Sequence, residues 1–162
     1  MLISCIQDAC RAGAETDENY VERVEDCISF LLGKAYQQVN QTAKRRLVPY
    51  GVTPVQFALL HVLWEQDGQS GADLGTRLRL DAATITGVLD RLVHTGFIER
   101  RPHPTDRRIH CVFLTEAGRA LQDPLDREAN LIHIECLGRF GTDEARRLCD
   151  MLAVLGSADE QG

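Results

Sequence analysis

The sequence predicts a mainly α-helical chain that carries one small β-hairpin. Apolar residues recur with a spacing near 3.6 through most of the chain, which is typical of helices with one buried face. Capping residues precede several of these segments, and glycine or proline follows them. Between residues 97 and 114 the pattern changes to that of extended chain around a proline-containing tip, which indicates a hairpin.

The first long helix is expected to follow an N-terminal tail, residues 1–18. Apolar side chains recur at helical spacing from Tyr20 onward, which predicts one helix to about Val48. The proline and the glycine that come next, Pro49 and Gly51, would end it.

Three shorter helices are expected between residues 53 and 96. Thr53 and Gln56 form a capping box at the start of the first, and Ser70 can cap the second, which is short. A tight turn then leads to Asp81, which caps the third. The third helix begins with small residues, and its buried stripe consists of Ile85, Val88, Leu89 and Leu92.

The hairpin is predicted to have two arms of about six residues each, within residues 97–101 and 109–114. Its tip contains the triplet Asp106-Arg107-Arg108. Both faces of the second arm are fairly apolar, so the sequence leaves its register open.

Two more helices are expected after the hairpin. Thr115 starts the first, and Pro124 is expected to kink it. Residues 142–144 cap the second, which ends at Gly156. Both helices carry apolar stripes, formed by Leu121, Leu125, Ala129, Ile132 and Cys136 in the first and by Leu148, Met151, Leu152 and Leu155 in the second.

Charge is distributed unevenly along the chain. The formal net charge is −6, yet residues 77–119 hold eight arginines against five acidic residues. A polyanionic partner would therefore meet the middle of the chain. The six cysteines include no CxxC pair and are expected to be free thiols. No secretory signal is evident and no apolar run approaches the ~20 residues of a membrane span, so a cytoplasmic protein without membrane contact is expected.

The order of helices and hairpin is that of a winged helix-turn-helix over residues 53–114. A helix that enters the major groove of DNA by its N-terminal end needs small or hydroxyl-bearing side chains there. The residues expected to face the groove are Ala82, Ala83, Thr84, Thr86, Gly87 and Asp90, with Arg91 nearby. Arg77 and Arg79 are expected to meet backbone phosphates. At the hairpin tip, Asp106, Arg107 and Arg108 are expected DNA contacts, with Arg108 entering the minor groove and Asp106 orienting it.

Three segments of the sequence resemble the multiple-antibiotic-resistance regulator (MarR) family of bacterial transcription factors. They are LVPYGVTPVQFALLHVL (47–63), LGTRLRLDAATITGVLDRLVHTGFIERR (74–101) and PTDRRIHCVFLTEAGR (104–119). The resemblance extends over roughly residues 20 to 155. It implies a homodimer in which residues 19–48 and 115–157 form the dimerisation helices, and a two-fold dimer would bind an inverted-repeat operator.

The resemblance also implies a repressor that is released from double-stranded DNA by a small molecule. The expected effector is an aromatic carboxylate or its CoA thioester, because aromatic side chains and a cation suit such a ligand. The candidate residues are Phe57, His61 and Trp64 on one face of the second helix, and Phe30, Lys34 and Tyr36 on the first. The alternative interpretation is that the Phe57–Trp64 stripe is ordinary core.

A second interpretation within the family is a thiol-based peroxide sensor. One branch of the family uses a cysteine near the start of the first helix, where Cys27 lies, and Cys136 of the other subunit would be the resolving thiol. The sequence departs from that branch at Leu31, where the branch has a tyrosine. Glu25 and Asp26 are moreover expected to raise the pKa of Cys27.

Other classes of function fit the sequence less well. The segment His133–Cys136 resembles part of the zinc-deaminase signature but lacks its P-C-x-x-C partner. No phosphate loop, dinucleotide fingerprint or Ser-His-Asp context is present, so neither an enzyme nor a cofactor is expected. No metal site is expected either, because histidines and cysteines lack ligand spacing. A winged helix used only for protein contacts stays open as an alternative that DNA-binding measurements would distinguish.

Overall fold

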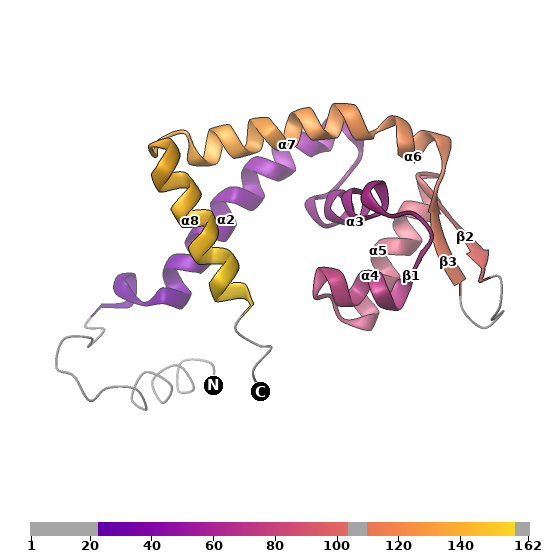
Figure 1. Cartoon of the computed structure of the whole chain (residues 1–162), viewed down its shortest axis with the longest axis horizontal. Helices are drawn as coiled ribbons and strands as arrows, with labels where there is room; N and C mark the ends of the chain where they lie inside the picture. The colour runs from indigo at the N-terminus through magenta and orange to yellow at the C-terminus, as the bar shows by residue number, and fades with distance from the viewer. Residues whose placement is uncertain (1–22, 104–109, 158–162) are drawn as a thin grey trace. The chain divides into compact units, whose positions relative to one another are not determined.

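The computed structural model describes residues 23–103 and 110–157 (Figure 1). These residues are mostly helical and include one three-stranded antiparallel sheet, which confirms the predicted fold class. The chain divides into two compact units, Met1–Gln38 and Val39–Gly162, with the boundary inside a long helix. The predicted division into tail, dimerisation helices and DNA-binding domain stays a prediction.

The described part of the first unit begins with a 3-10 turn, η1 (Val24–Asp26), followed by the start of α2 (Ile28–Leu47). The long helix predicted from Tyr20 therefore starts later among the described residues, and Tyr20 itself lies outside them. Cys27 has an extended backbone between the two elements. Cys27 separates the two helical elements because it holds the N-cap position of α2, and N-cap residues have extended backbone.

The second unit begins with the rest of α2, whose end matches the prediction. A 3-10 turn, η2 (Val48–Tyr50), follows, and Gly51 reverses the chain with φ of 68°, in the region that favours glycine. The capping box at the start of α3 (Pro54–Glu65) is confirmed. The Thr53 hydroxyl accepts from the Gln56 backbone N–H at 3.4 Å, and the Gln56 side-chain oxygen accepts from the Thr53 backbone N–H at 2.8 Å.

The next two helices are α4 (Gly71–Leu78) and α5 (Ala82–His94), and both begin as the sequence predicts. Ser70 caps α4 by accepting from the Asp73 backbone N–H at 3.1 Å. Asp81 caps α5 through its carboxylate. The tight turn between the helices, residues 79–81, therefore leads directly into the capped start of α5.

The hairpin consists of β2 (Ile98–Pro102) and β3 (His110–Leu114), which pair with Ile98 opposite Leu114. Five residues of each arm lie among the described residues, and residue 109, the predicted start of the second arm, lies outside them. The structure settles the register of β3, in which Cys111, Val112 and Leu114 are buried. A third strand, β1 (Gln69–Ser70), pairs with the other edge of β3. The sequence did not predict β1, because two residues are too few to produce a periodic signal.

Three helices follow the sheet: α6 (Glu116–Ala120), α7 (Gln122–Leu137) and α8 (Thr142–Gly156). The kink predicted at Pro124 is a break between α6 and α7 just before it, as expected for a residue that cannot donate a helical hydrogen bond. The cap predicted at residues 142–144 is displaced to Gly141. Its backbone N–H donates to the Glu144 carboxylate at 3.0 Å, which satisfies a helix end without a hydroxyl.

The hydrophobic core of the second unit lies among α3, α4, α5 and the sheet, which Figure 1 shows gathered together. Its fully buried side chains include Leu59, Leu60, Leu63, Leu74, Val88, Leu92, Ile98 and Val112. These contacts fix α5 against α3 and α4. No single described helix is long and apolar enough to cross a membrane, although the bent pair Ile28–Tyr50 and Pro54–Glu65 meets the length and composition requirement.

Candidate nucleic-acid interface

The turn between α4 and α5 is tight because backbone hydrogen bonds close it. The N–H of Arg79 donates to the Thr76 carbonyl at 3.2 Å, and that of Leu80 donates to the Gly75 carbonyl at 2.9 Å. Arg79 has φ of 51°, a left-handed conformation that L-residues adopt at a cost. A Cβ on Gly75 would lie 3.3 Å from the Leu80 carbonyl oxygen, so a small residue is favoured there.

The first turns of α5 present small side chains to solvent. The predicted stripe of Ile85, Val88, Leu89 and Leu92 is buried, which turns the other side of the helix outward. The predicted DNA-facing residues lie there: Ala82, Ala83, Thr84, Thr86 and Arg91 are exposed, and Gly87 is half-buried. A Cβ on Gly87 would meet the Arg91 guanidinium at 3.9 Å, so Arg91 extends back over the glycine. The structure therefore brings these six residues together on one accessible surface.

The hydrogen-bond donors at the start of α5 are engaged within the helix. Asp81 Oδ1 accepts from the backbone N–H groups of Ala83 at 3.0 Å and Thr84 at 2.8 Å. Asp81 Oδ2 accepts from the Thr84 hydroxyl at 2.6 Å, and the Thr86 hydroxyl donates to the Ala82 carbonyl at 2.7 Å. The bond from the Thr84 hydroxyl, followed by those from the backbone, lowers the pKa of Asp81 and keeps its carboxylate ionised.

Arg77 and Arg79, the predicted phosphate contacts, have protein partners in this structure. Arg77 pairs with Glu65 at the end of α3, and this hydrogen bond lowers the pKa of Glu65. The same carboxylate lies 3.3 Å from Nδ1 of His61. Arg79 donates to the carbonyl of Gly156 at the end of α8. The Arg77 side chain is 43% exposed, so a phosphate can compete with Glu65 for it.

The base of the wing carries arginine contacts that the sequence did not predict. Arg100 on β2 pairs with Asp90 on α5 at 2.8 Å. The Arg101 guanidinium carbon lies 4.7 Å from the ring centroid of Phe113, a cation–π contact. Residue spacing does not predict ion pairs between a helix and a strand, so the sequence does not indicate that Asp90 and Arg100 pair. The predicted tip residues Asp106, Arg107 and Arg108 lie outside the described residues.

The aromatic cluster predicted on α3 forms in the structure. The ring centroids of Phe57, His61 and Trp64 lie 5.8 to 6.2 Å apart in edge-to-face arrangements. Phe57 and Trp64 pack against the hydrophobic core, while the His61 side chain is 48% exposed. The cluster is therefore partly core, in line with the alternative interpretation, and His61 is its accessible end.

The motif Leu-Thr-x-x-Gly joins the wing to α6. The Thr115 hydroxyl donates to the Gly96 carbonyl at 2.6 Å and accepts from the Gly118 N–H at 3.1 Å. The Gly118 carbonyl accepts from the Trp64 indole N–H at 3.1 Å. A Cβ on Gly118 would lie only 2.0 Å from the carbonyl oxygen of Phe97. The junction therefore requires glycine, and it connects the aromatic cluster to the hairpin.

In the first unit, the predicted effector residues lie on α2. Lys34 Nζ is 5.5 Å from the ring centroid of Phe30, and Tyr36 is exposed. Cys27, which directly precedes α2, has its Sγ 3.1 Å from the Ser29 hydroxyl. That hydroxyl and the backbone N–H groups that follow Cys27 lower the pKa of its thiol.

The prediction that Glu25 and Asp26 raise the pKa of Cys27 is therefore wrong. Both carboxylates are exposed and solvated, whereas the donors of the helix start contact the sulfur directly. Cys136, the predicted resolving thiol, is half-buried on α7. Among the described residues no group of three or more histidine, cysteine, aspartate or glutamate side chains is arranged to hold a metal ion.

A charged network ties the end of α2 to α7. Arg46 lies 3.3 Å from the Glu128 carboxylate and 2.9 Å from that of Glu135, which also pairs with Arg45. The Tyr50 hydroxyl donates to Glu128 at 3.2 Å. The hydrogen bonds from Arg45 and then Arg46 lower the pKa of Glu135. The network thus holds α7 at the entry to α3, the first helix of the winged head.

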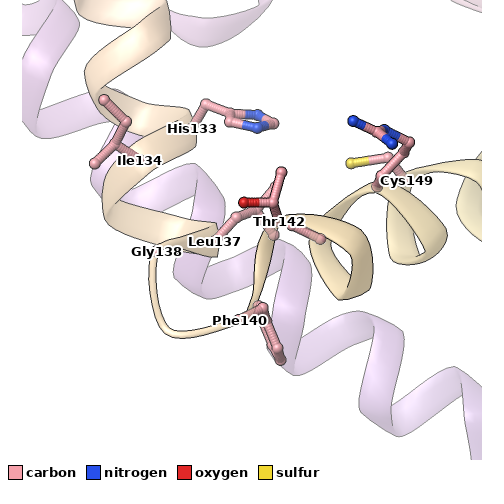
Figure 2. Close-up of a pocket in the computed structure, with 9 residues that line it drawn as sticks. His133, Ile134, Leu137, Gly138, Phe140, Thr142 and Cys149 are labelled. Carbon is pink, nitrogen blue, oxygen red and sulfur yellow. The ribbon is translucent and has the colours of Figure 1, made fainter.

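The corner between α7 and α8 contains an apolar hollow of about 470 Å³. Figure 2 shows His133 on α7 and Cys149 on α8 directed toward the same space. The hollow is lined by His133, Ile134, Leu137, Gly138, Phe140, Thr142, Ala145, Arg146 and Cys149. Further large apolar side chains are exposed on α8: Met151, Leu152, Val154 and Leu155.

Comparison with known proteins places the chain in a family. The model of the MarR family matches residues 52–110. The transcriptional repressor NicR of Pseudomonas putida is 31% identical, over 85% of this chain and 87% of its own. The structure of Bordetella bronchiseptica BpsR, solved to explain regulation of its DNA binding by 6-hydroxynicotinic acid, has a TM-score of 0.81 at 27% identity over 86% of this chain and 100% of its own.

A further solved structure is CouR from Rhodococcus jostii bound to p-coumaroyl-CoA. It has a TM-score of 0.74 at 25% identity and covers 85% of this chain and 96% of its own. NicR is thus a transcriptional repressor and BpsR a DNA-binding protein, and the solved structures of BpsR and CouR share the fold of this chain. The chain therefore belongs to the MarR family of transcriptional regulators.

Proposed function

We propose that the protein is a dimeric, ligand-responsive repressor that binds an inverted-repeat operator. The observation that carries the proposal is the exposed start of α5, where small side chains on a firmly packed helix allow close approach to base edges. The proposed base contacts are Ala82, Ala83, Thr84, Thr86, Gly87 and Arg91. Arg77 and Arg79 bind backbone phosphates, and Arg108 enters the minor groove beside Arg107 and Asp106.

The apolar surface of α7 and α8 supports a dimer. Met151, Val154 and Ile134 are each more than half exposed, and Ile134 also lines the hollow at the corner of the two helices. Large apolar side chains exposed on neighbouring helices are typical of an interaction site, and a second copy of the chain would bury them. Two-fold symmetry then presents two copies of α5 to the two halves of an operator.

Fluorescence anisotropy with operator duplexes at two salt concentrations tests the DNA-binding part of the proposal, and sedimentation velocity tests the dimer. Arg77→Ala is expected to weaken binding and to flatten the dependence of log K on log salt by about one unit. Arg23→Ala removes an exposed arginine that precedes α2, and is expected to leave both quantities unchanged. If the protein sediments as a monomer, or does not bind duplex DNA at low salt, the proposal is contradicted. A winged helix used for protein contacts is then favoured.

The effector is proposed to be an aromatic carboxylate or its CoA thioester that binds at the accessible end of the α3 cluster. One support is the edge-to-face cluster itself, in which His61 is accessible to solvent. The other is that 6-hydroxynicotinic acid regulates DNA binding by BpsR and that CouR binds p-coumaroyl-CoA. A ligand that binds only the folded protein raises its melting temperature. We therefore expect 6-hydroxynicotinic acid or p-coumaroyl-CoA to raise the melting temperature of the wild type and to lower its affinity for DNA.

Two variants distinguish this site from the hollow between α7 and α8. His61→Leu is expected to abolish the ligand response, whereas Phe140→Ala, in the hollow, is expected to retain it. The reverse result would move the effector to the hollow. Because Trp64 is the only tryptophan of the chain, its fluorescence reports ligand binding at the α3 cluster directly.

A second candidate, peroxide sensing, is favoured by the lowered pKa of Cys27, because the thiolate is the form that peroxides oxidise. If this function is present, peroxide releases DNA from the wild type but not from Cys27→Ser. The exposed Cys149 provides the control, since Cys149→Ser is expected to respond like the wild type. Peroxide release that survives the Cys27 substitution eliminates this candidate.

A further inference from the structure

The two threonines at the start of α5 have no proton left to offer a base. A hydroxyl has one proton and two lone pairs. The partner of the Thr84 hydroxyl is the Asp81 carboxylate, and the partner of the Thr86 hydroxyl is the Ala82 carbonyl. Neither partner can donate, so in both bonds the proton must come from the threonine. What the hydroxyls present outward is therefore lone pairs and the neighbouring methyl groups.

The other polar groups at this end of the helix lead to the same result. The backbone N–H groups of Ala83 and Thr84 are directed to Asp81, whose own oxygens are acceptors. Ala83 and Gly87, which lie between the two threonines on the exposed surface, have no polar side-chain atom. The arginines nearest to it along the chain are Arg79, in the turn before α5, and Arg91, a turn further along the helix. The start of α5 thus has acceptors and no free side-chain donor.

We infer that the start of α5 selects bases by their exocyclic amino groups, with Thr84 and Thr86 accepting from N6 of adenine or N4 of cytosine. The inference rests on the proposed binding of this helix in the major groove. There, adenine and cytosine present amino donors, whereas guanine presents N7 and O6 and thymine presents O4 as acceptors. A guanine or thymine edge would face the threonine lone pairs without a proton between them.

Phosphate binding by this helix end is disfavoured for the same reason. A helix N-terminus binds phosphate through free backbone N–H groups. Here Asp81 occupies two of those groups and adds a negative charge that repels a phosphate. The start of α5 is thereby assigned to base edges, while phosphates meet the arginines of the turn.

The test begins with full-length protein and a pool of randomised duplexes, from which the operator is selected. Each selected adenine is then replaced by 2-aminopurine, which still pairs with thymine but removes the amino group from the major groove. Each selected cytosine is replaced by N4-methylcytosine, whose methyl group blocks the outward N–H. Binding of the wild type, Thr86→Val and Thr86→Ser is measured on every duplex, and melting curves confirm that the variants fold.

At one position per half-site, one of these replacements is expected to weaken wild-type binding about 10-fold. Thr86→Ser, which keeps the hydroxyl, is expected to show the same loss. Thr86→Val is expected to bind the unmodified operator about 10-fold more weakly and to lose nothing further at that position. The replacement that shows this coupling identifies the base as adenine or cytosine.

Two outcomes overturn the inference and leave the proposed function standing. One is that Thr86→Val binds the unmodified operator as tightly as the wild type does. The other is that the wild type and Thr86→Val lose equal affinity at every modified position. If no duplex is selected from the pool at all, the proposed function fails, and the inference fails with it.

Discussion

Gly118→Ala is expected to destabilise the protein far more than an ordinary glycine substitution in a helix. The added Cβ would lie 2.0 Å from the Phe97 carbonyl oxygen and 3.3 Å from Leu114 Cδ2. Since carbon and oxygen atoms rarely approach closer than 3.0 Å, α6 must move away from the hairpin by about 1 Å. The clash involves backbone on both sides, so no side-chain rotation relieves it.

The magnitude follows from the bonds that such a shift stretches. The Thr115 N–H donates to the Phe97 carbonyl at 3.1 Å, and the Trp64 indole donates to the Gly118 carbonyl at 3.1 Å. Each bond contributes about 1 kcal/mol, and overpacking adds about 2 kcal/mol. The better helix propensity of alanine offsets about 1 kcal/mol. The expected loss in free energy of unfolding is therefore about 3 kcal/mol.

Urea unfolding followed by circular dichroism at one fixed protein concentration measures this loss. Gly33→Ala is the matched control, because a Cβ there meets nothing within 4 Å and Gly33 lies inside α2. The control is expected to leave stability unchanged or to raise it by up to about 1 kcal/mol. A loss below about 1 kcal/mol for Gly118→Ala, or equal losses for both variants, would refute the steric argument.

Three further predictions concern the turn, the aromatic cluster and the charged network. Arg79→Gly should raise the free energy of unfolding by up to about 1 kcal/mol, because glycine adopts the left-handed backbone without strain. The same variant should weaken DNA binding. A loss of stability would show that the hydrogen bond from Arg79 to Gly156 outweighs the strain. Trp64→Phe should cost about 1 to 2 kcal/mol, because the Gly118 carbonyl loses its donor; circular dichroism is the probe, and a neutral result would mean that water replaces the indole. The pKa of Glu135 is lowered, so the ionised side chain contributes fully to the free energy of unfolding above the ordinary pKa of 4.5, and this contribution is lost as the pH falls below 4.5. The melting temperatures of the wild type and Glu135→Gln should therefore converge toward low pH. A difference that stays constant with pH would contradict this.

Much of the fold was predictable because its signals are local. The caps at Thr53, Ser70 and Asp81 involve residues within three positions of each other, and the buried stripe of α5 is a simple period. The wing arms and the end of α2 follow from the same kind of signal. These features depend on the chain's immediate neighbours, which the sequence displays.

The remaining features depend on contacts between distant segments. β1 exists because Gln69 and Ser70 meet the free edge of β3, and Arg100 meets Asp90 only after α5 and β2 have packed. The pKa of Cys27 differs in direction from the prediction, because the donors of the helix start act on the sulfur and the charges that neighbour it in sequence do not reveal them. For the candidate site, the sequence identified the exposed residues of α5 but not the internal bonds of their hydroxyls.

The carboxylate of Glu65 is shared by Arg77, a proposed phosphate contact, and His61, a proposed effector contact. If Arg77 moves to a phosphate, Glu65 still has His61 at 3.3 Å, which keeps the cost of that exchange low. A bound acid that pairs with His61 would leave Arg77 as the partner of Glu65, and Arg77 would then be less available to a DNA phosphate. Because such linkage is reciprocal, operator binding would lower the affinity of the protein for the acid by the same factor. On the proposed function, one half-exposed glutamate would thus make effector and operator compete without sharing a single contact.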